Sequence, residues 1–446
     1  MVALLVMTAC TSGGASTSTE PTMTSAPTST APSTTRDPSV VPTVGPDSSV
    51  VPTIEPDPIG LPGNGWIALT VGQDEAEARD LDIWLVALDH EPRRVIGTDT
   101  DTVDELCPAF SPDGRRLAYG RLEGESASLA VADMDADGRA SDPVTIEVGD
   151  GLPPPCPVWS PDGSQVAFGA ARTSPINPTT SAVGSEVWIV TLSDNRATVL
   201  PDLLATDLEW SPDGSLLAIA SGSDQVVAGN TLHDGRIYLY APSSQTMRSL
   251  DATLGATMLT WSPDGGRIAY ERIARQTDDV KVELQVIDVE TEDQEVLATY
   301  GRLHGIGPVW SPDGEWVLYQ RCAPASWCNG ERHAVVLASV SDTEDGPSSA
   351  REVVITSPGT ATGTGRTMNP YRVTWSPDGR YLLYRAWGHP VPREDFQEWT
   401  GLAAVPIDQD QEAVVLAEIP GMLAYDGYSE GSTFVPIQTW GTRASD

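Results

Sequence analysis

Six copies of a short motif, an aromatic residue followed by Ser-Pro-Asp-Gly, constrain the fold of this chain more than any other feature. The copies follow one another at spacings of 49, 51, 51, 49 and 65 residues. Repeats with a period of this size are typical of solenoids, propellers and other repeat architectures. The aromatic residues are Phe110, Trp159, Trp210, Trp261, Trp310 and Trp375.

Each residue of the motif has a physical role in a tight hairpin turn. Proline presets φ, aspartate can hydrogen-bond the turn backbone, and glycine tolerates a positive φ. The aromatic residue before the turn ends one strand, and we expect it to fill the space between neighbouring blades. A short apolar strand follows each turn, as at residues 117–119 and 268–270.

The strands around each motif group into units of four, which is the size of a propeller blade. Three strands precede the first motif, at residues 66–70, 82–88 and 94–96, and an apolar segment at 432–440 follows the last motif. Pairing of these two ends would close the ring and remove open sheet edges. We therefore predict an all-β fold, a β-propeller with seven four-stranded blades, or six if the ends form no blade.

The Ser-Pro-Asp-Gly turn followed by a strand such as Ile268-Ala269-Tyr270 resembles the TolB-like β-propeller family. The resemblance covers residues 64–440 and implies a propeller domain at 61–446. TolB proper carries an additional α/β domain ahead of its propeller, whereas this chain has a Ser/Thr/Pro-rich segment there. The arrangement resembles that of bacterial propeller lipoproteins.

The first ten residues resemble the end of a bacterial lipoprotein signal, because an apolar run at 1–9 leads through small residues into Cys10. We predict a truncated signal at 1–9, a lipid on Cys10 and a disordered tether at 10–60. The alternative is a frayed apolar terminus with a stray thiol. The prediction places a monomeric protein outside the cell, held at the membrane by its lipid.

The four remaining cysteines fall into two pairs, Cys107 with Cys156 and Cys322 with Cys328. An even number of cysteines in an exported chain predicts two disulfides, although sequence alone leaves their connectivity open. A zinc site is the alternative, but it lacks Cys-x-x-Cys spacing and nearby histidines.

The formal net charge is −37, from 63 acidic and 26 basic residues. Phosphate contacts need clustered lysine and arginine, so this balance argues against nucleic-acid binding. Cationic or neutral partners fit better, although an acidic surface also serves solubility alone.

Three further patterns invite a chemical interpretation. Gly-x-Ser-x-Gly at 427–431 matches a nucleophile elbow around Ser429, but only fifteen residues follow it, too few for the partner residues of that fold. The acidic segment 133–138 resembles a calcium loop, yet Val144 replaces the ligating glutamate, and a plain turn is favoured. The acidic run at 99–105 is interpreted as a solvated loop rather than a metal site. We predict no catalytic residue, metal site or cofactor.

The two ends of a propeller differ in what their connections can do. The Ser-Pro-Asp-Gly turns are short and uniform, while the connections at the other end are long and varied, at 171–185, 221–235, 271–281, 321–332 and 385–400. Recognition usually depends on variable loops held by a rigid scaffold. Folding back of their aromatic residues over the loops is the alternative. The candidate binding residues are Trp327, Trp387, His389 and Trp399 on these loops, and Asp207, His304 and Arg372 at the channel mouth.

The sequence therefore predicts a cell-envelope lipoprotein whose propeller binds an envelope protein or a glycan through the long-loop face. The alternative is a propeller lyase or hydrolase with Asp207, Glu209, His304 and Arg372 at the channel mouth. A sensor that acts with a membrane kinase or a secretion system is a third hypothesis.

Overall fold

The computed structural model describes strands from residue 65 onward, with gaps in the connections. It describes residues 65–73, 81–87, 90–96, 103–135, 137–150, 155–174, 177–203, 205–222, 224–227, 230–233, 235–276, 279–301, 307–322, 333–340, 350–353, 369–376, 378–388, 399–407, 414–419, 422–423 and 439–442. The predicted signal, the lipid on Cys10 and the tether lie outside these residues and stay predictions. No helix within the described residues is long and apolar enough to span a membrane.

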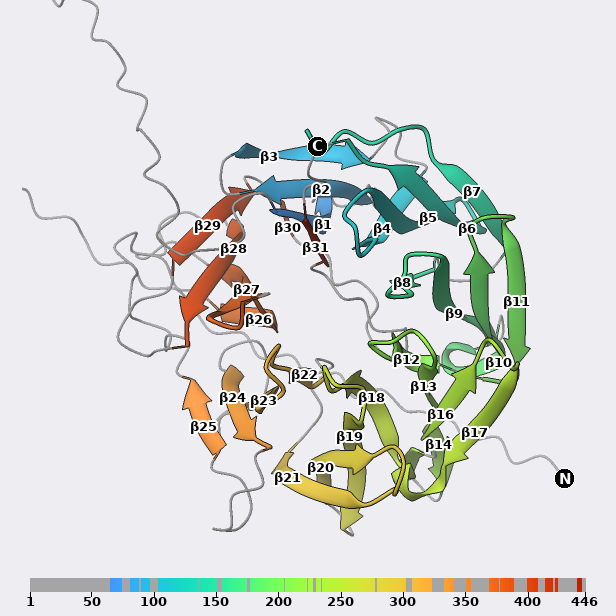
Figure 1. The fold of residues 1–446 in the computed structure, drawn as a ribbon, viewed down its shortest axis with the longest axis vertical. Helices are drawn as coiled ribbons and strands as arrows, with labels where there is room; N and C mark the ends of the chain where they lie inside the picture. Colours follow the sequence, from blue (N-terminus) through green and yellow to red (C-terminus); the bar gives the residue numbers. More distant parts are fainter. Residues whose placement is uncertain are drawn as a thin grey trace, which may run out of the picture. The chain divides into compact units, whose positions relative to one another are not determined.

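Within the described residues, the strands form seven antiparallel sheets of four or five strands, which are the seven predicted blades, and one separate two-stranded hairpin (Figure 1). Blade 1 contains β1 (Gly65–Gln73), β2 (Leu81–Ala87), β3 (His90–Ile96), β30 (Met422–Leu423) and β31 (Thr439–Thr442). Blade 2 contains β4 (Val103–Phe110), β5 (Arg116–Glu123), β6 (Ser126–Asp133) and β7 (Val144–Asp150). Blade 3 contains β8 (Val158–Trp159), β9 (Gln165–Ser174), β10 (Asn177–Thr191) and β11 (Arg196–Pro201).

In blades 2 to 7, the four strands of each sheet follow one another in chain order from the axis of the ring outward. Blade 4 contains β12 (Ala205–Trp210), β13 (Leu217–Ser221), β16 (Arg236–Ala241) and β17 (Thr246–Leu250), and a 3₁₀ turn, η1 (Asp251–Thr253), leads on to blade 5. Blade 5 contains β18 (Ala256–Trp261), β19 (Arg267–Gln276), β20 (Asp279–Asp288) and β21 (Gln294–Gly301). Blade 6 contains β22 (Val309–Trp310), β23 (Trp316–Cys322), β24 (His333–Ser339) and β25 (Ala350–Val353). Blade 7 contains β26 (Asn369–Trp375), β27 (Tyr381–Gly388), β28 (Trp399–Pro406) and β29 (Val414–Ile419).

The two ends of the chain meet in blade 1 and close the ring, as predicted. β31 pairs with β1 so that Trp440 lies opposite Ile67. In blade 4, Trp210 lies opposite Leu217 in the same register. The C-terminal strand therefore supplies the aromatic position of a seventh motif, and the N-terminal strand supplies the apolar segment that follows it.

The Ser-Pro-Asp-Gly motif forms the predicted hairpin turn. In blade 4, the Gly214 N–H donates to the Ser211 carbonyl oxygen at 2.8 Å, and the Ser211 hydroxyl donates to Asp213 Oδ1 at 2.6 Å. The φ of Gly214 is 71°, a conformation that favours glycine. A Cβ on Gly214 would lie 3.5 Å from Cδ of Pro161, so the turns of successive blades lie against one another.

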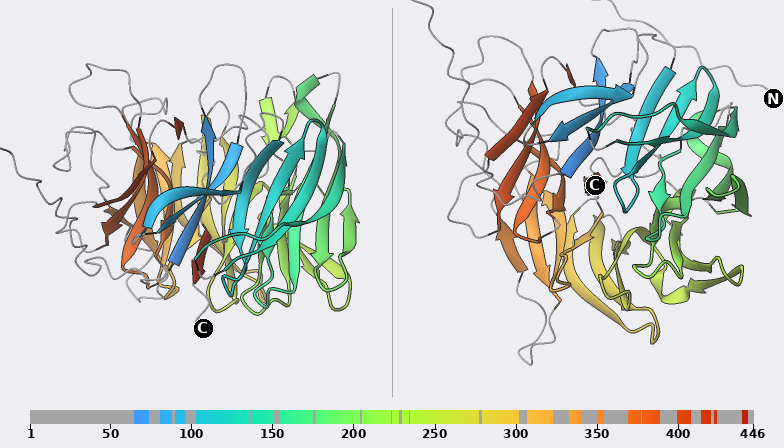
Figure 2. Two further views of the ribbon diagram at one scale, coloured as in Figure 1. Left: turned by 90° about the horizontal axis from the view of Figure 1, so that it is seen from above. Right: turned by 45° about the horizontal axis from the view of Figure 1, so that its top comes forward.

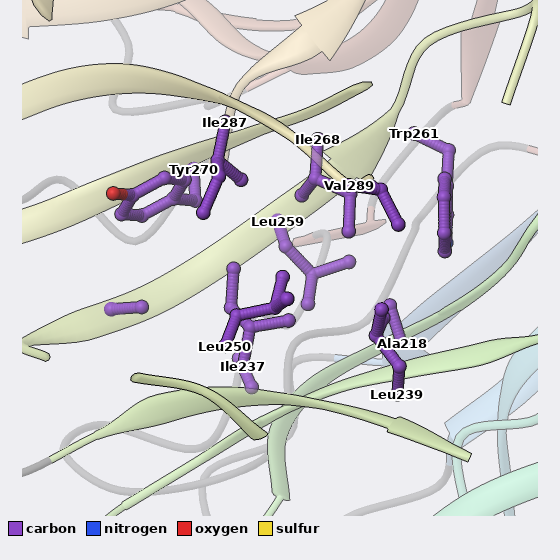
Figure 3. Packing of buried hydrophobic residues seen from close by; sticks show 12 residues of the cluster. Ala218, Ile237, Leu239, Leu250, Leu259, Trp261, Ile268, Tyr270, Ile287 and Val289 are labelled. Atoms are coloured by element: carbon purple, nitrogen blue, oxygen red, sulfur yellow. The ribbon is translucent and has the colours of Figure 1, made fainter. Parts of the chain in front are cut away.

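The motif tryptophan joins each blade to the blade before it. Trp261 packs among apolar side chains of blades 4 and 5, and Figure 3 shows the two sets of side chains facing each other. Its indole N–H also donates to the Glu209 carbonyl oxygen of blade 4 at 3.1 Å. The same bond recurs from Trp159 to Ala109 (2.8 Å), Trp210 to Val158 (3.3 Å), Trp310 to Thr260 (3.2 Å) and Trp375 to Val309 (3.3 Å).

Three of the long connections opposite the turns are strand hairpins, a detail that the sequence did not predict. β9 and β10 continue through most of 171–185, β14 (Asp224–Val227) pairs with β15 (Asn230–His233), and β19 and β20 pair out to Gln276 and Asp279. β-branched residues such as Ile273, Val280 and Val282 favour the extended backbone, and pairing satisfies its hydrogen bonds. Figure 2 shows strands projecting at this end, which we call the hairpin face.

Candidate functional site

One repeat position, on or just before the innermost strand of a blade, joins neighbouring blades at two junctions of the ring. It lies three residues before the motif aromatic residue, and we call it the axial position. The strand register shifts around it in β4, β12, β18 and β26, as expected of a β-bulge, which re-aims side chains. The axial residues after blade 1 are Cys107, Cys156, Asp207, Met258, Gly307 and Arg372.

Two axial cysteines form a disulfide between blades 2 and 3. Their Cα atoms lie 4.9 Å apart, within the normal range for such a bond. Both side chains are buried, and the Cys107 N–H donates to Thr70 Oγ1 of blade 1 at 3.1 Å. A disulfide was predicted here, and the structure supplies the connectivity that the sequence left open, Cys107 with Cys156. Cys328 lies outside the described residues, so its pairing with Cys322 stays a prediction.

Asp207 and Glu209, which we call the acidic clasp, join blade 4 to blade 5. Asp207 Oδ2 accepts from the Leu259 N–H and Glu209 Oε2 from the Trp261 N–H, each at 2.9 Å. Asp207 Oδ1 accepts from the Leu208 N–H at 2.9 Å. Each carboxyl group therefore accepts a hydrogen bond from a backbone amide of the next blade.

The surroundings of the acidic clasp raise the pKa of each of its carboxyl groups. Burial raises the pKa of Asp207 to about 7, although the two amide bonds favour the charged form. Burial, with repulsion from Asp207, raises the pKa of Glu209 to about 8. Both residues keep part of their surface accessible, which moderates the effect of burial. The charge of the clasp therefore changes near neutral pH.

A third carboxyl group, Glu271 of β19, lies close enough to interact with Asp207. Burial, and then repulsion from Asp207, raise its pKa to about 7. The Tyr300 hydroxyl donates to Glu271 Oε1, and the Tyr300 and Tyr319 rings stack with centroids 5.1 Å apart. Glu271 is 1% exposed, and its Oε2 has no hydrogen-bond partner. Asp207, Glu209 and Glu271 form no ion pair with a described cationic side chain.

The turn face holds a shallow depression of 330 Å³ between blades 4 and 5, lined by their two motif turns. Asp213 and Asp264 stand at its rim, and hydrogen bonds from Ser211 and Ser262 lower the pKa of these carboxyl groups.

Within the described residues, no group of three or more His, Cys, Asp or Glu is arranged to hold a metal ion. In the turn between β6 and β7, the Gly138 N–H donates to the Asp135 carbonyl oxygen at 2.9 Å, and Arg139 pairs with Asp137 at 2.7 Å.

The predicted binding residues fall in different parts of the ring. Asp207 lies at the axis, and Arg372 occupies the bulge of β26. At the hairpin face of blade 7, Trp387 lies opposite Thr400 and Trp399 opposite Gly388. Trp327, His389 and His304 lie outside the described residues, as does Ser429, so their roles stay predictions.

Two buried polar residues that the sequence interpretation missed lie ten residues after the motif tryptophan. They are Glu271 in blade 5 and Gln320 in blade 6, and both are 1% exposed. Blades 2, 3 and 4 carry Gly120, Gly169 and Ala220 at this position. An alignment of the repeats would have revealed this change from small to polar side chains.

Comparisons with known proteins agree with the architecture. The family model for the TolB β-propeller domain (PD40) matches residues 83–343, more than half of the chain. An uncharacterised protein of Agrobacterium fabrum is 34% identical over 109 residues, 24% of this chain and 33% of that protein. WD repeat-containing protein 1-B of Xenopus laevis is 32% identical over 149 residues, 31% of this chain and 23% of that protein. This chain thus covers a third or less of the length of these relatives.

One solved structure, an oligogalacturonate lyase in complex with manganese, has a TM-score of 0.52 at 15% identity. The match covers 74% of this chain and 84% of the lyase chain, and it shows a shared fold. The motif turns, the seven blades and the family match lead to one assignment. This chain belongs to the TolB β-propeller domain family.

Proposed function

We propose that this chain is a binding module of the bacterial cell envelope, whose hairpin face meets an envelope protein or a glycan. The observation that carries the proposal is the difference between the two ends of the ring. Six turns of one sequence close the turn face, whereas the hairpin face changes from a short turn at Gly124 in blade 2 to long hairpins in blades 3, 4 and 5. Such variation on a constant scaffold suits recognition.

A location outside the cytoplasm is the second part of the proposal. A disulfide between Cys107 and Cys156 supports it, because disulfides persist in oxidising compartments. A lipid on Cys10 and a tether at 10–60 would hold the propeller at the membrane. The net charge of −37 fits partners other than nucleic acid.

An enzyme that acts near the axis is the competing function. Asp207 and Glu209 have the raised pKa values that suit a general acid. Their carboxyl oxygens, however, accept backbone N–H bonds that join two blades. Binding is therefore the better-supported function.

The test is capture of partners from bacterial envelope extracts by the full chain. The test variant combines Trp327→Ala, Trp387→Ala and Trp399→Ala. A matched control combines Val144→Ala, Met247→Ala and Val296→Ala on the outer strands, where these side chains are 54%, 47% and 46% exposed. The proposal predicts that the wild type and the control capture the same specific partner and the tryptophan variant loses it. Equal capture by the wild type, the control and the tryptophan variant would show that the partner does not bind through these three tryptophans.

A further inference from the structure

Gln320 is an anomaly in the interior of the ring. Its side chain is 1% exposed, yet neither its amide nitrogen nor its amide oxygen has a hydrogen-bond partner. The hydroxyl of Tyr384, which is 0% exposed, also lacks a partner. Buried polar groups are nearly always hydrogen-bonded, because each unpaired group costs stability. Three unpaired polar atoms therefore need an explanation.

The two side chains belong to the same junction, between blades 6 and 7. Tyr384 packs with Leu318 in the apolar cluster of that junction. Gln320 follows Leu318 by two residues on β23, and alternate residues of a strand share one face. The amide of Gln320 and the hydroxyl of Tyr384 thus lie on the same side of blade 6. Burial raises the pKa of Tyr384, so its hydroxyl keeps its proton and can donate.

In the junction before it, the residue at the equivalent position has one internal hydrogen-bond partner. Glu271, the counterpart of Gln320 in blade 5, receives a hydrogen bond from Tyr300. Glu271 also lies opposite Met258 on the innermost strand β18. In blade 6, β22 pairs with β23 only at Val309 and Trp310, and the axial residue is Gly307, which has no side chain. Gln320 therefore lies beyond the end of the β22 ladder, one strand from the axis.

We propose that Gln320 and Tyr384 bind a hydroxyl-bearing group of a neutral sugar that enters from the axis of the ring. A primary amide offers two donors and two acceptors, and a phenol offers one donor and an acceptor. A sugar hydroxyl both donates and accepts, so it satisfies this neutral pair without bringing charge into the interior. This inference rests on the proposed binding function and narrows it to glycans.

A second buried glutamine offers a matched control. Gln285 is 4% exposed, and its amide accepts from the Tyr270 hydroxyl and donates to Glu283, both at 2.6 Å. Replacing a partnered group should destabilise the protein, whereas replacing an unpartnered group with an apolar one should not. In the absence of ligand, Gln320→Met should raise the Tm and Gln285→Met should lower it.

The binding test uses the full chain and a panel of glucose, mannose, N-acetylglucosamine and galacturonate, followed by calorimetry and ligand-observed NMR. We expect a neutral sugar to bind the wild type and Gln285→Met alike. Gln320→Met should weaken that binding ~10-fold or more, and Tyr384→Phe, which preserves packing, should weaken it several-fold.

Two results would overturn the inference. One is that no neutral sugar binds, or that Gln320→Met leaves the affinity unchanged. The other is a high-resolution crystal structure grown with the sugar in which ordered water alone bonds to Gln320 and Tyr384. Either result would reject the sugar site. If the hairpin face still captured an envelope protein, the broader binding function would remain supported.

Discussion

Two junctions of the ring use the same repeat position in different ways. Between blades 2 and 3, the axial residues Cys107 and Cys156 form a covalent bond. Between blades 4 and 5, axial Asp207 accepts a backbone N–H from Leu259, and Glu209 adds a second such bond. All blades thus share one backbone arrangement, while the chemistry of the axial side chain determines whether a junction is sensitive to reductant or to pH. One junction should respond to reductant and the other to pH.

Breaking the covalent junction should have the largest effect. The disulfide closes a loop of 49 residues, and the chain-entropy model gives about 4 kcal/mol for a loop of this length. The variant Cys107→Ala/Cys156→Ala should therefore have a free energy of unfolding, measured in urea, that is lower than that of the wild type by this amount. A reductant should affect the wild type more than the variant. Equal urea midpoints for the two proteins would show that the bond adds nothing to the junction.

Both junctions also share the tryptophan bond, which can be tested in blade 5. Trp261→Phe removes the indole bond to Glu209 and part of a buried ring, and we expect it to cost about 2 kcal/mol. Trp188→Phe is the control, because the Trp188 indole bonds to Glu186 within its own strand. Urea unfolding should show a clearly smaller cost for the control. The reverse order would mean that the indole bond does not join blades.

The acidic clasp should make the second junction sensitive to pH. The folded clasp holds protons that the unfolded chain has lost, because the pKa of Asp207 is about 7 and that of Glu209 is about 8. Stability should therefore be full near pH 4 and fall as the pH rises through 8, by about 1–2 kcal/mol after allowance for partial exposure. The variant Asp207→Asn/Glu209→Gln should flatten this decline in urea unfolding measured from pH 5 to 8.

For a turn aspartate, Asp213, we expect a pH dependence of stability with the opposite sign to that of the acidic clasp. The Ser211 hydroxyl lowers the pKa of Asp213, so the stability that it contributes should be lost as the pH falls below about 4. Asp213→Asn should leave the decline between pH 5 and 8 as it is in the wild type. If it instead removed that decline, the clasp would not be the source of the pH dependence.

The smallest expected effect concerns the side chain that covers the first junction. The Arg116 guanidinium lies 4.9 Å from the Trp159 ring and donates to the Gly163 carbonyl oxygen at 2.6 Å. Blade 3 carries Gln165 at the equivalent position, so Arg116→Gln copies a side chain that the repeat already accepts. We expect thermal unfolding to show a loss of about 0.5–1 kcal/mol. Arg115→Gln, at an exposed neighbour, should change little.

The fold could be predicted from the sequence because the motif has local physical causes. Gly214 has the positive φ that the turn requires, and Trp210 packs between two blades. Pairing of the two chain ends followed from the need to cover sheet edges. The hairpins of blades 3 to 5 were missed because variable, polar segments resemble loops until both arms are seen to pair.

Much less of the candidate site could be predicted. Asp207 was singled out by its charge and its place before a motif, but its bond to the Leu259 N–H depends on the packing of two blades. Glu271 and Gln320 escaped notice because their burial arises only when the ring closes around them. Side chains that act across junctions are invisible to an interpretation that treats each repeat alone.

The most direct test of the central claim, that this propeller binds rather than transforms its partner, measures binding and turnover in the same samples. The full chain is incubated with neutral, amino and acidic oligosaccharides, and calorimetry is run beside mass analysis of each saccharide. We predict that a saccharide binds and is recovered intact, with binding reduced in the Gln320→Met variant. Cleavage of any saccharide that is lost with Asp207→Asn would contradict it and establish an enzyme.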